Sequence, residues 1–208
     1  MPRPAKHDED RILSAAGALA SAGGPAAATV VGIAAAIGAP SGSIYHRFKS
    51  RDELLGRLWL AKATFLQDRW MSALALPDPA EAGLAACLSI PQSVREDLEG
   101  ARIMLLYRRE DFLSDGWPAA MKSESKRLAA QVEEGLETFN RRLFGRSSVE
   151  ARQTATLAVL DLPMAGVRRF VASNTPPPRS LDASLERAYA AIIDEHRRMA
   201  PRRRPTSR

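Results

Sequence analysis

Apolar residues recur every three or four positions along most of the chain, which is the spacing of residues on one face of an α-helix. Runs that alternate apolar and polar residues, as strands do, are nearly absent. The pattern therefore predicts an all-α protein. Glycines and prolines divide it into segments, and the predicted helices cover residues 8–22, 30–37, 41–48, 51–74, 80–89, 94–113, 118–144, 148–173 and 180–199.

A pair of short helices in residues 29–48 stands out near the N-terminus. Thr29 is placed to cap the first helix, and Gly38 to end it, because glycine readily adopts the left-handed conformation that stops a helix. Ile44 and Phe48 return to the core from the second helix, which leaves its other side free to enter a major groove. The pattern predicts a helix-turn-helix unit, although such helix pairs also occur in proteins that do not bind DNA.

The net charge of the chain says less about DNA binding than its magnitude suggests. The net charge is +6, from 30 basic and 24 acidic residues, but six arginines follow Glu195. Residues 1–50 hold five basic and three acidic residues. Composition alone therefore does not establish DNA binding. The arginine-rich residues 200–208 are expected to form a basic disordered tail that adds a nonspecific, salt-sensitive attraction to DNA.

Specific residues of the helix pair and its flanks carry a family resemblance. The helix pair supplies Ile33-Ala34, Gly38, Gly42-Ser43-Ile44-Tyr45 and Phe48, the next helix opens with Lys49-Ser50-Arg51-Asp52-Glu53-Leu54, and the preceding helix contributes Ile12, Ala15, Ala16, Leu19 and Gly23. This pattern resembles the DNA-binding domain of TetR-family transcriptional repressors. The remainder of the chain agrees with that family only in length and helicity.

The resemblance implies a set of DNA-contacting residues in the N-terminal part of the chain, which we call the head. By position, they are Thr29, Pro40, Ser41, Gly42, Ser43, Tyr45, His46, Arg47, Lys49 and Arg51. Within this set, Thr29, Tyr45 and Arg51 are expected to hold phosphates, which fixes the register of the protein on DNA.

Base recognition is expected to come from the second helix of the pair. The resemblance assigns Ser41, Ser43 and His46 to base edges. Val31 and Gly32 replace polar residues that the family often carries on the groove-facing side of the first helix, so that helix is expected to contribute little to base readout.

The resemblance also divides the chain into a DNA-binding domain (1–50), an effector-binding and dimerisation domain (51–199) and the tail (200–208). The last two helices would form the dimer interface, through apolar stripes that are equally compatible with an ordinary core. The stripes consist of Leu157, Leu160, Met164, Val167, Val171, Leu185, Tyr189, Ile192 and Ile193. Pro163 should remove one backbone hydrogen bond and bend its helix.

Aromatic and methionine side chains of the middle helices suggest an adaptable apolar pocket, with Arg108 or Asp161 to orient a ligand. Core packing is the alternative role for each. The candidates are Phe65, Trp70, Met104, Tyr107, Arg108, Phe112, Trp117, Met121, Phe139 and Asp161.

Enzymatic, metal-binding and membrane functions find little support in the sequence. The three histidines are His7, His46 and His196, and neither an HxxxH, a Ser-His-Asp nor a glycine-rich phosphate motif is present. Cys87 is the single cysteine, which excludes an intrachain disulfide. We expect no cofactor and no metal. No apolar run reaches the roughly 18 residues of a membrane span, and a secretory signal is lacking, so a cytoplasmic location is expected.

Together these features predict a homodimeric, ligand-responsive repressor that binds a near-palindromic operator in double-stranded DNA and an unidentified small-molecule effector. A helical ligand-binding or scaffold protein that has lost DNA binding is the first alternative, favoured by the weakly charged head. A helical-bundle enzyme is the second.

Overall fold

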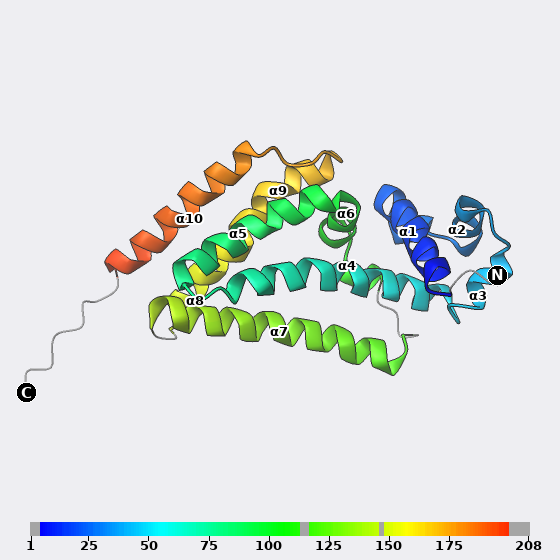
Figure 1. The fold of residues 1–208 in the computed structure, drawn as a ribbon, viewed down its shortest axis with the longest axis horizontal. Helices are drawn as coiled ribbons and strands as arrows, with labels where there is room; N and C mark the ends of the chain where they lie inside the picture. Colours follow the sequence, from blue (N-terminus) through cyan, green and yellow to red (C-terminus); the bar gives the residue numbers. More distant parts are fainter. Residues whose placement is uncertain (1–4, 113–116, 146–147, 200–208) are drawn as a thin grey trace, which may run out of the picture.

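The computed structural model describes residues 5–112, 117–145 and 148–199, and every regular element within them is helical (Figure 1). The all-α prediction is confirmed, while the predicted tail lies outside the described residues. The elements are α1 (Ala5–Gly23), η1 (Pro25–Ala27), α2 (Val30–Ile37), α3 (Ser41–Tyr45), α4 (Arg51–Leu74), α5 (Pro79–Glu96), α6 (Leu98–Leu106), η2 (Arg109–Asp111), α7 (Ala119–Phe144), α8 (Val149–Thr156), the π-helical segment η3 (Leu157–Asp161), α9 (Leu162–Ala172) and α10 (Ser180–Met199).

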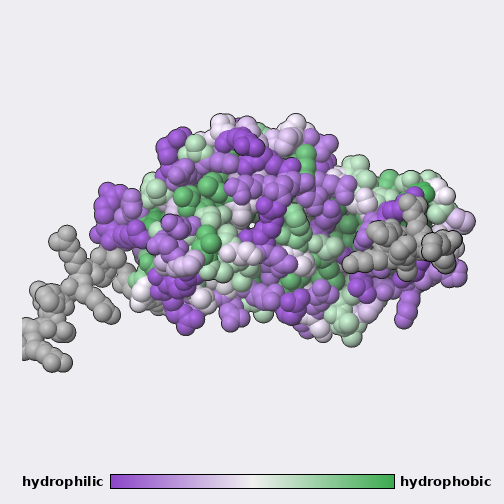
Figure 2. All heavy atoms as spheres, viewed as in Figure 1, coloured by the Kyte–Doolittle hydropathy of each residue, from purple (hydrophilic) through white to green (hydrophobic). Residues whose placement is uncertain are grey.

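Helix α4 runs from the α1–α3 head into the larger helical body (Figure 1). Its first half contributes Leu54 and Leu58 to a core shared with α1, α2 and α3, which we call the first core. Its second half contributes Trp70 and Leu74 to a second core with α5, α7, η3 and α10. One helix therefore packs in both the head and the body. On the molecular surface, hydrophilic side chains cover most of the face shown in Figure 2, and hydrophobic ones form separate small patches.

The helix ends in the head follow the signals in the sequence. The Thr29 hydroxyl accepts the N–H of Gly32 at 3.0 Å, and Gly38 ends α2 at φ +65°. The Ser50 hydroxyl accepts the N–H of Glu53 at 3.0 Å at the start of α4. These contacts satisfy donors that a helix start leaves unpaired. The bounds of α2, α4 and α10 are those predicted.

Pro91 does not separate two helices, contrary to the prediction. Helix α5 continues through this buried proline to Glu96, because the fixed φ of proline is compatible with a helix. The break falls at Asp97, whose carboxylate accepts the N–H of Gly100 at 2.8 Å and caps α6. Two other predicted ends are also too long: α6 ends at Leu106 and α3 at Tyr45.

Pro163 is accompanied by a change of helix type. The predicted helix 148–173 consists of α8, the π-helical η3 and α9, with Pro163 in the first turn of α9. Proline has no N–H to donate to the carbonyl four residues earlier, which is that of Val159. The buried indole of Trp70 donates to this carbonyl at 3.0 Å. The hydrogen bond therefore joins α4 to the altered segment.

Trp70→Phe should lower the free energy of unfolding by about 2 kcal/mol, since it removes the indole donor from a buried carbonyl. Urea denaturation measures the change. Trp59→Phe is the matched control, because the Trp59 indole donates to no acceptor among the described residues. Adding Pro163→Ala to Trp70→Phe restores a backbone donor and should recover part of the loss. An equal cost for both Trp→Phe variants would contradict this role of Trp70.

Candidate nucleic-acid interface and ligand cavity

The helix-turn-helix unit is held together by a small apolar interior. Ile33 and Ala34 of α2 pack with Ile44 and Phe48 against Ile12 of α1, and all five side chains are buried. This arrangement fixes the relative position of α2 and α3. The sides of α2 and α3 that face away from this interior are available to DNA.

Most predicted DNA-contacting residues lie on the outside of the head. Thr29, Pro40, Gly42, Tyr45, His46, Arg47 and Lys49 are exposed, whereas Ser41, Ser43 and Arg51 are half-buried. Tyr45 keeps 55% of its surface exposed. The hydroxyl of Ser43 donates to the carbonyl of Pro40 at 2.7 Å, so this side chain must exchange that bond before its proton can reach a base.

Arg51 contacts the backbone of the head rather than standing free. Its Nε donates to the carbonyl of Ala28 at 3.0 Å, and a terminal guanidinium nitrogen donates to the carbonyl of Pro25. These bonds attach the start of α4 to the segment that precedes α2. Arg51 therefore braces the N-terminus of α2, and its expected contact with a phosphate remains a prediction.

Val31 is a surface residue that the sequence interpretation undervalued. It lies in the first turn of α2 with 72% of its surface exposed, while its neighbour Val30 is buried. An exposed apolar side chain on a DNA-binding head has the chemistry to contact a thymine methyl group. The sequence carries a signal for this exposure, since Val30, Ile33 and Ala34 already form the inner face of α2 and Val31 does not share it.

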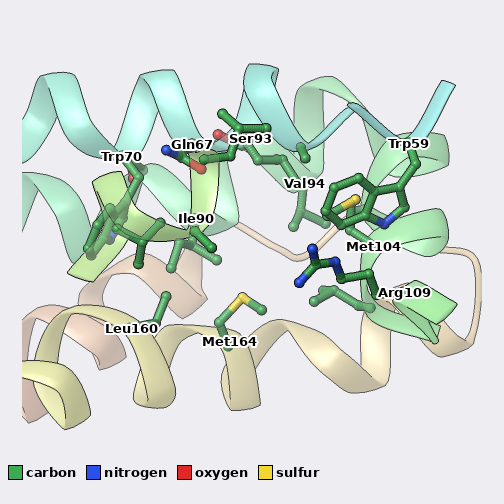
Figure 3. Close-up of a pocket in the computed structure, with 18 of the residues that line it drawn as sticks. Trp59, Gln67, Trp70, Ile90, Ser93, Val94, Met104, Arg109, Leu160 and Met164 are labelled. Atoms are coloured by element: carbon green, nitrogen blue, oxygen red, sulfur yellow. The ribbon is translucent and has the colours of Figure 1, made fainter. Parts of the chain in front are cut away.

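A cavity of about 290 Å³ lies in the body, between α4, α5, α6, α7 and the segment from η3 to α9 (Figure 3). Its lining is almost entirely apolar, with a tryptophan at each end. The lining residues are Trp59, Ala63, Leu66, Gln67, Trp70, Ser89, Ile90, Ser93, Val94, Ala101, Met104, Leu105, Arg109, Ser125, Leu128, Ala129, Val132, Leu160 and Met164.

Of the ten predicted pocket residues, the cavity brings together Trp70 and Met104. Four others are buried in the cores, namely Phe112, Trp117 and Met121 in the first and Phe139 in the second. Phe65, Arg108 and Asp161 are exposed, and the Tyr107 hydroxyl donates to the carbonyl of Ser21 at 3.4 Å. The lining arginine is Arg109, one residue after the predicted Arg108.

The predicted dimer stripes also point mainly inward. Leu160 and Met164 line the cavity. Leu185, Tyr189 and Ile193 are buried in the second core, and Val167 and Val171 in a third core with Val94 and Ala101. These seven side chains thus pack within one chain, which is the alternative that the sequence left open. Ile192 is half-buried, and Leu157 is 45% exposed.

Metal and membrane chemistry have no visible site in the described ranges. Within them, no cluster of three or more His, Cys, Asp and Glu side chains is arranged to hold a metal ion. Burial raises the pKa of the Cys87 thiol to about 12, so this thiol stays protonated at neutral pH. None of the described helices has the length and apolarity needed to cross a membrane.

Residues 12–58 match the family model for bacterial regulatory proteins of the tetR family. The matched stretch runs from α1 through the helix-turn-helix unit into the start of α4. Residues 12–58 are therefore a DNA-binding domain of the tetR family. The family match covers the head, where the exposed residues described above lie.

Solved structures extend the likeness to the whole fold. FadR, the fatty acid degradation regulator of Bacillus halodurans, is 18% identical over 93% of this chain and 97% of its own, with a TM-score of 0.67. PfmR, a TetR-family regulator of Thermus thermophilus, is 22% identical over 88% and 94%, with a TM-score of 0.68. FadR of Bacillus subtilis in complex with stearoyl-CoA is 15% identical over 88% and 97%, with a TM-score of 0.66. No curated protein matches the sequence.

Arg51→Lys tests the brace at the start of α2. A lysine keeps the charge but lacks the guanidinium fork that reaches two carbonyls, so backbone amides 27–29 should exchange with solvent about tenfold faster. Hydrogen exchange measures this in the absence of DNA. Arg57→Lys, on the exposed side of the same helix, is the control. If exchange at 27–29 is unchanged, Arg51 does not stabilise this segment.

Proposed function

We propose that the chain is a homodimeric, ligand-responsive repressor that binds a near-palindromic operator. The observation that carries this proposal is the position of α6. One side of this short helix lines the apolar cavity, and its other side is bonded to the DNA-binding head. A ligand that changes the cavity therefore acts on an element that contacts the head directly.

The cavity-facing residues of α6 are Ala101, Met104 and Leu105. Between them in sequence, Arg102 points elsewhere: its Nε donates to the carbonyl of Ser21 in α1 at 3.1 Å, and a terminal nitrogen donates to the carbonyl of Val171 in α9 at 2.7 Å. Arg102 thus ties α6 to the head and to the body at once.

Further contacts make the junction between α1 and α6 tight. The side chain of Glu99 approaches Gly17 so closely that a Cβ there would lie 2.2 Å from its Oε1. Lys62 of α4 lies 2.9 Å from Asp97 and 3.7 Å from Glu99. Burial raises the pKa of Glu99. Because α6 is in direct contact with α1 here, a displacement of α6 acts on the head.

Such a shift is a means of control in a dimer. Two recognition helices bind successive major grooves only at a matching separation, so a ligand that changes the separation lowers operator affinity. The proposed interface uses the outer faces of η3, α9 and α10, where Leu157, Ala165 and Ala190 are exposed. The complex of Bacillus subtilis FadR with stearoyl-CoA gives a precedent for a ligand in a similar fold.

Operator binding should depend on the exposed side of the recognition helix. Genomic fragments retained by the purified protein supply the operator, and gel shifts give its affinity. Tyr45→Ala should weaken binding at least tenfold, and Tyr45→Ala with Arg51→Ala further, since each loses an expected phosphate contact. Val149→Ala and Arg187→Ala, both exposed and in the body, are the controls. Sedimentation of the complex should give two chains per operator.

If the folded double variant binds the operator as tightly as the wild type, the contact assignment is wrong. If the wild-type protein retains no specific fragment, the chain is instead a ligand-binding or scaffold protein that has lost DNA binding.

Filling the cavity from α6 should mimic a ligand. Ala101 is fully buried and lines the cavity, so Ala101→Leu should displace α6 and weaken operator binding by at least fivefold, the lower range of allosteric coupling. Gel shifts with the identified operator measure the effect. Ala155→Leu is the control, because Ala155 is equally buried but lies in the second core. Equal effects of the two variants would contradict coupling through α6.

A further inference from the structure

Arg109 differs from the other residues that line the cavity. It is the one charged side chain in the lining among the described residues. Figure 3 shows that it enters from the same end as Trp59 and Met104, with its guanidinium directed toward the middle of the cavity. Since Arg109 is an exposed residue, this end of the cavity connects the apolar interior with water.

The guanidinium of Arg109 is held in place without a carboxylate partner among the described residues. Its Cζ lies 5.4 Å from the centre of the Trp59 ring, and one terminal nitrogen donates to the Ser125 hydroxyl at 2.5 Å. No carboxylate of the described residues lies within ion-pair distance of it. By contrast, Arg69 and Arg95 pair with the carboxylates of Glu96 and Asp182.

Two of the uncharged polar side chains of the lining already have partners within the chain. The amide of Gln67 donates to Gln131 at 3.2 Å, and the hydroxyl of Ser89 donates to the carbonyl of Ala86 at 2.8 Å. An arginine has five N–H donors in a fork that matches a carboxylate. Arg109 is therefore the group in this cavity that is equipped to bind a charged part of a ligand.

The size and walls of the cavity define the rest of the ligand. Its apolar lining favours a hydrocarbon or aromatic body. A water molecule occupies roughly 30 Å³ in the liquid, so a volume of about 290 Å³ holds roughly ten groups of that size.

We propose that the effector is a monocarboxylic acid with an apolar body of roughly ten non-hydrogen atoms, bound with its carboxylate on the guanidinium of Arg109. This inference rests on the proposed ligand-responsive function and names the chemical class of the ligand. The apolar body lies between Trp59 and Trp70, and the carboxylate lies at the end of the cavity that meets water.

Isothermal titration of the full-length protein with four probes tests the assignment. Decanoate, 1-decanol and decyltrimethylammonium share one chain length and differ in the charge of the head, and decanoyl-CoA carries the acyl chain on a larger anionic head. Decanoate should bind at least tenfold more tightly than 1-decanol, and the cation should bind more weakly than both. Tighter binding of decanoyl-CoA than of decanoate would overturn the carboxylate head.

Variants at two adjacent arginines locate the head of the ligand. Arg109→Gln should reduce the affinity for decanoate to that for 1-decanol, and Arg109→Lys should restore part of it, because lysine keeps the charge without the fork. Arg108→Gln removes an equal charge outside the cavity and should leave decanoate binding unchanged. Circular dichroism checks that the variants fold.

The inference is overturned if 1-decanol binds the wild type as tightly as decanoate, if Arg109→Gln leaves decanoate binding unchanged, or if none of the probes binds. The regulatory proposal is judged separately, since the operator measurements on Tyr45→Ala and Ala101→Leu use no ligand. The two can therefore fail independently.

Discussion

The structure depends on the apolar packing of α4, which has to satisfy two cores with one helix. At 1.5 Å per residue, its 24 residues span about 36 Å. Leu54 and Leu58 pack in the head, while Trp70 and Leu74 pack in the body. Head and body are consequently not two units joined by a loose linker, and the rest of the molecule is arranged around this common axis.

Because α4 is shared, the other contacts between head and body determine how they move relative to each other. The short helix α6 supplies these contacts at the end of α1, and it also forms a wall of the cavity. The cavity itself is bounded at its far end by the Trp70 side chain, which bonds to the π-helical segment created next to Pro163. The cavity, the π-helical segment η3 and helix α6 thus lie in one continuous region of the structure.

The sequence predicted the features that depend on local chemistry. Thr29, Gly38 and Ser50 determine helix ends through bonds within four residues, so the bounds of α2 and α4 were predicted correctly. Pro91 does not separate two helices as predicted, because proline also fits inside a buried helix. Only the packing of α5 shows whether a proline ends a helix or lies within it. The helix type does change next to Pro163, but the indole that donates to the carbonyl of Val159 belongs to Trp70, 89 residues before Val159 along the chain.

The candidate sites were harder to predict than the helices, for the same reason. An apolar stripe reveals that a face is buried but not what covers it, so Leu160 and Met164 were assigned to a dimer interface and line the cavity instead. Arg108 and Arg109 are indistinguishable in composition, and only the tertiary position of Trp59 and Ser125 separates them.

The bonds made by Arg102 have a consequence for how this protein can change over time. Its hydrogen-bond partners are main-chain carbonyls, at Ser21, Val171 and Ala172, and every amino acid provides such a group. Substitutions at positions 21, 171 and 172 can therefore accumulate without removing the acceptors, provided that the helices keep their course. Because Arg102 bonds to the backbone of α1 and α9, the junction tolerates substitution of the side chains in those helices. Arg102 itself has no equivalent replacement.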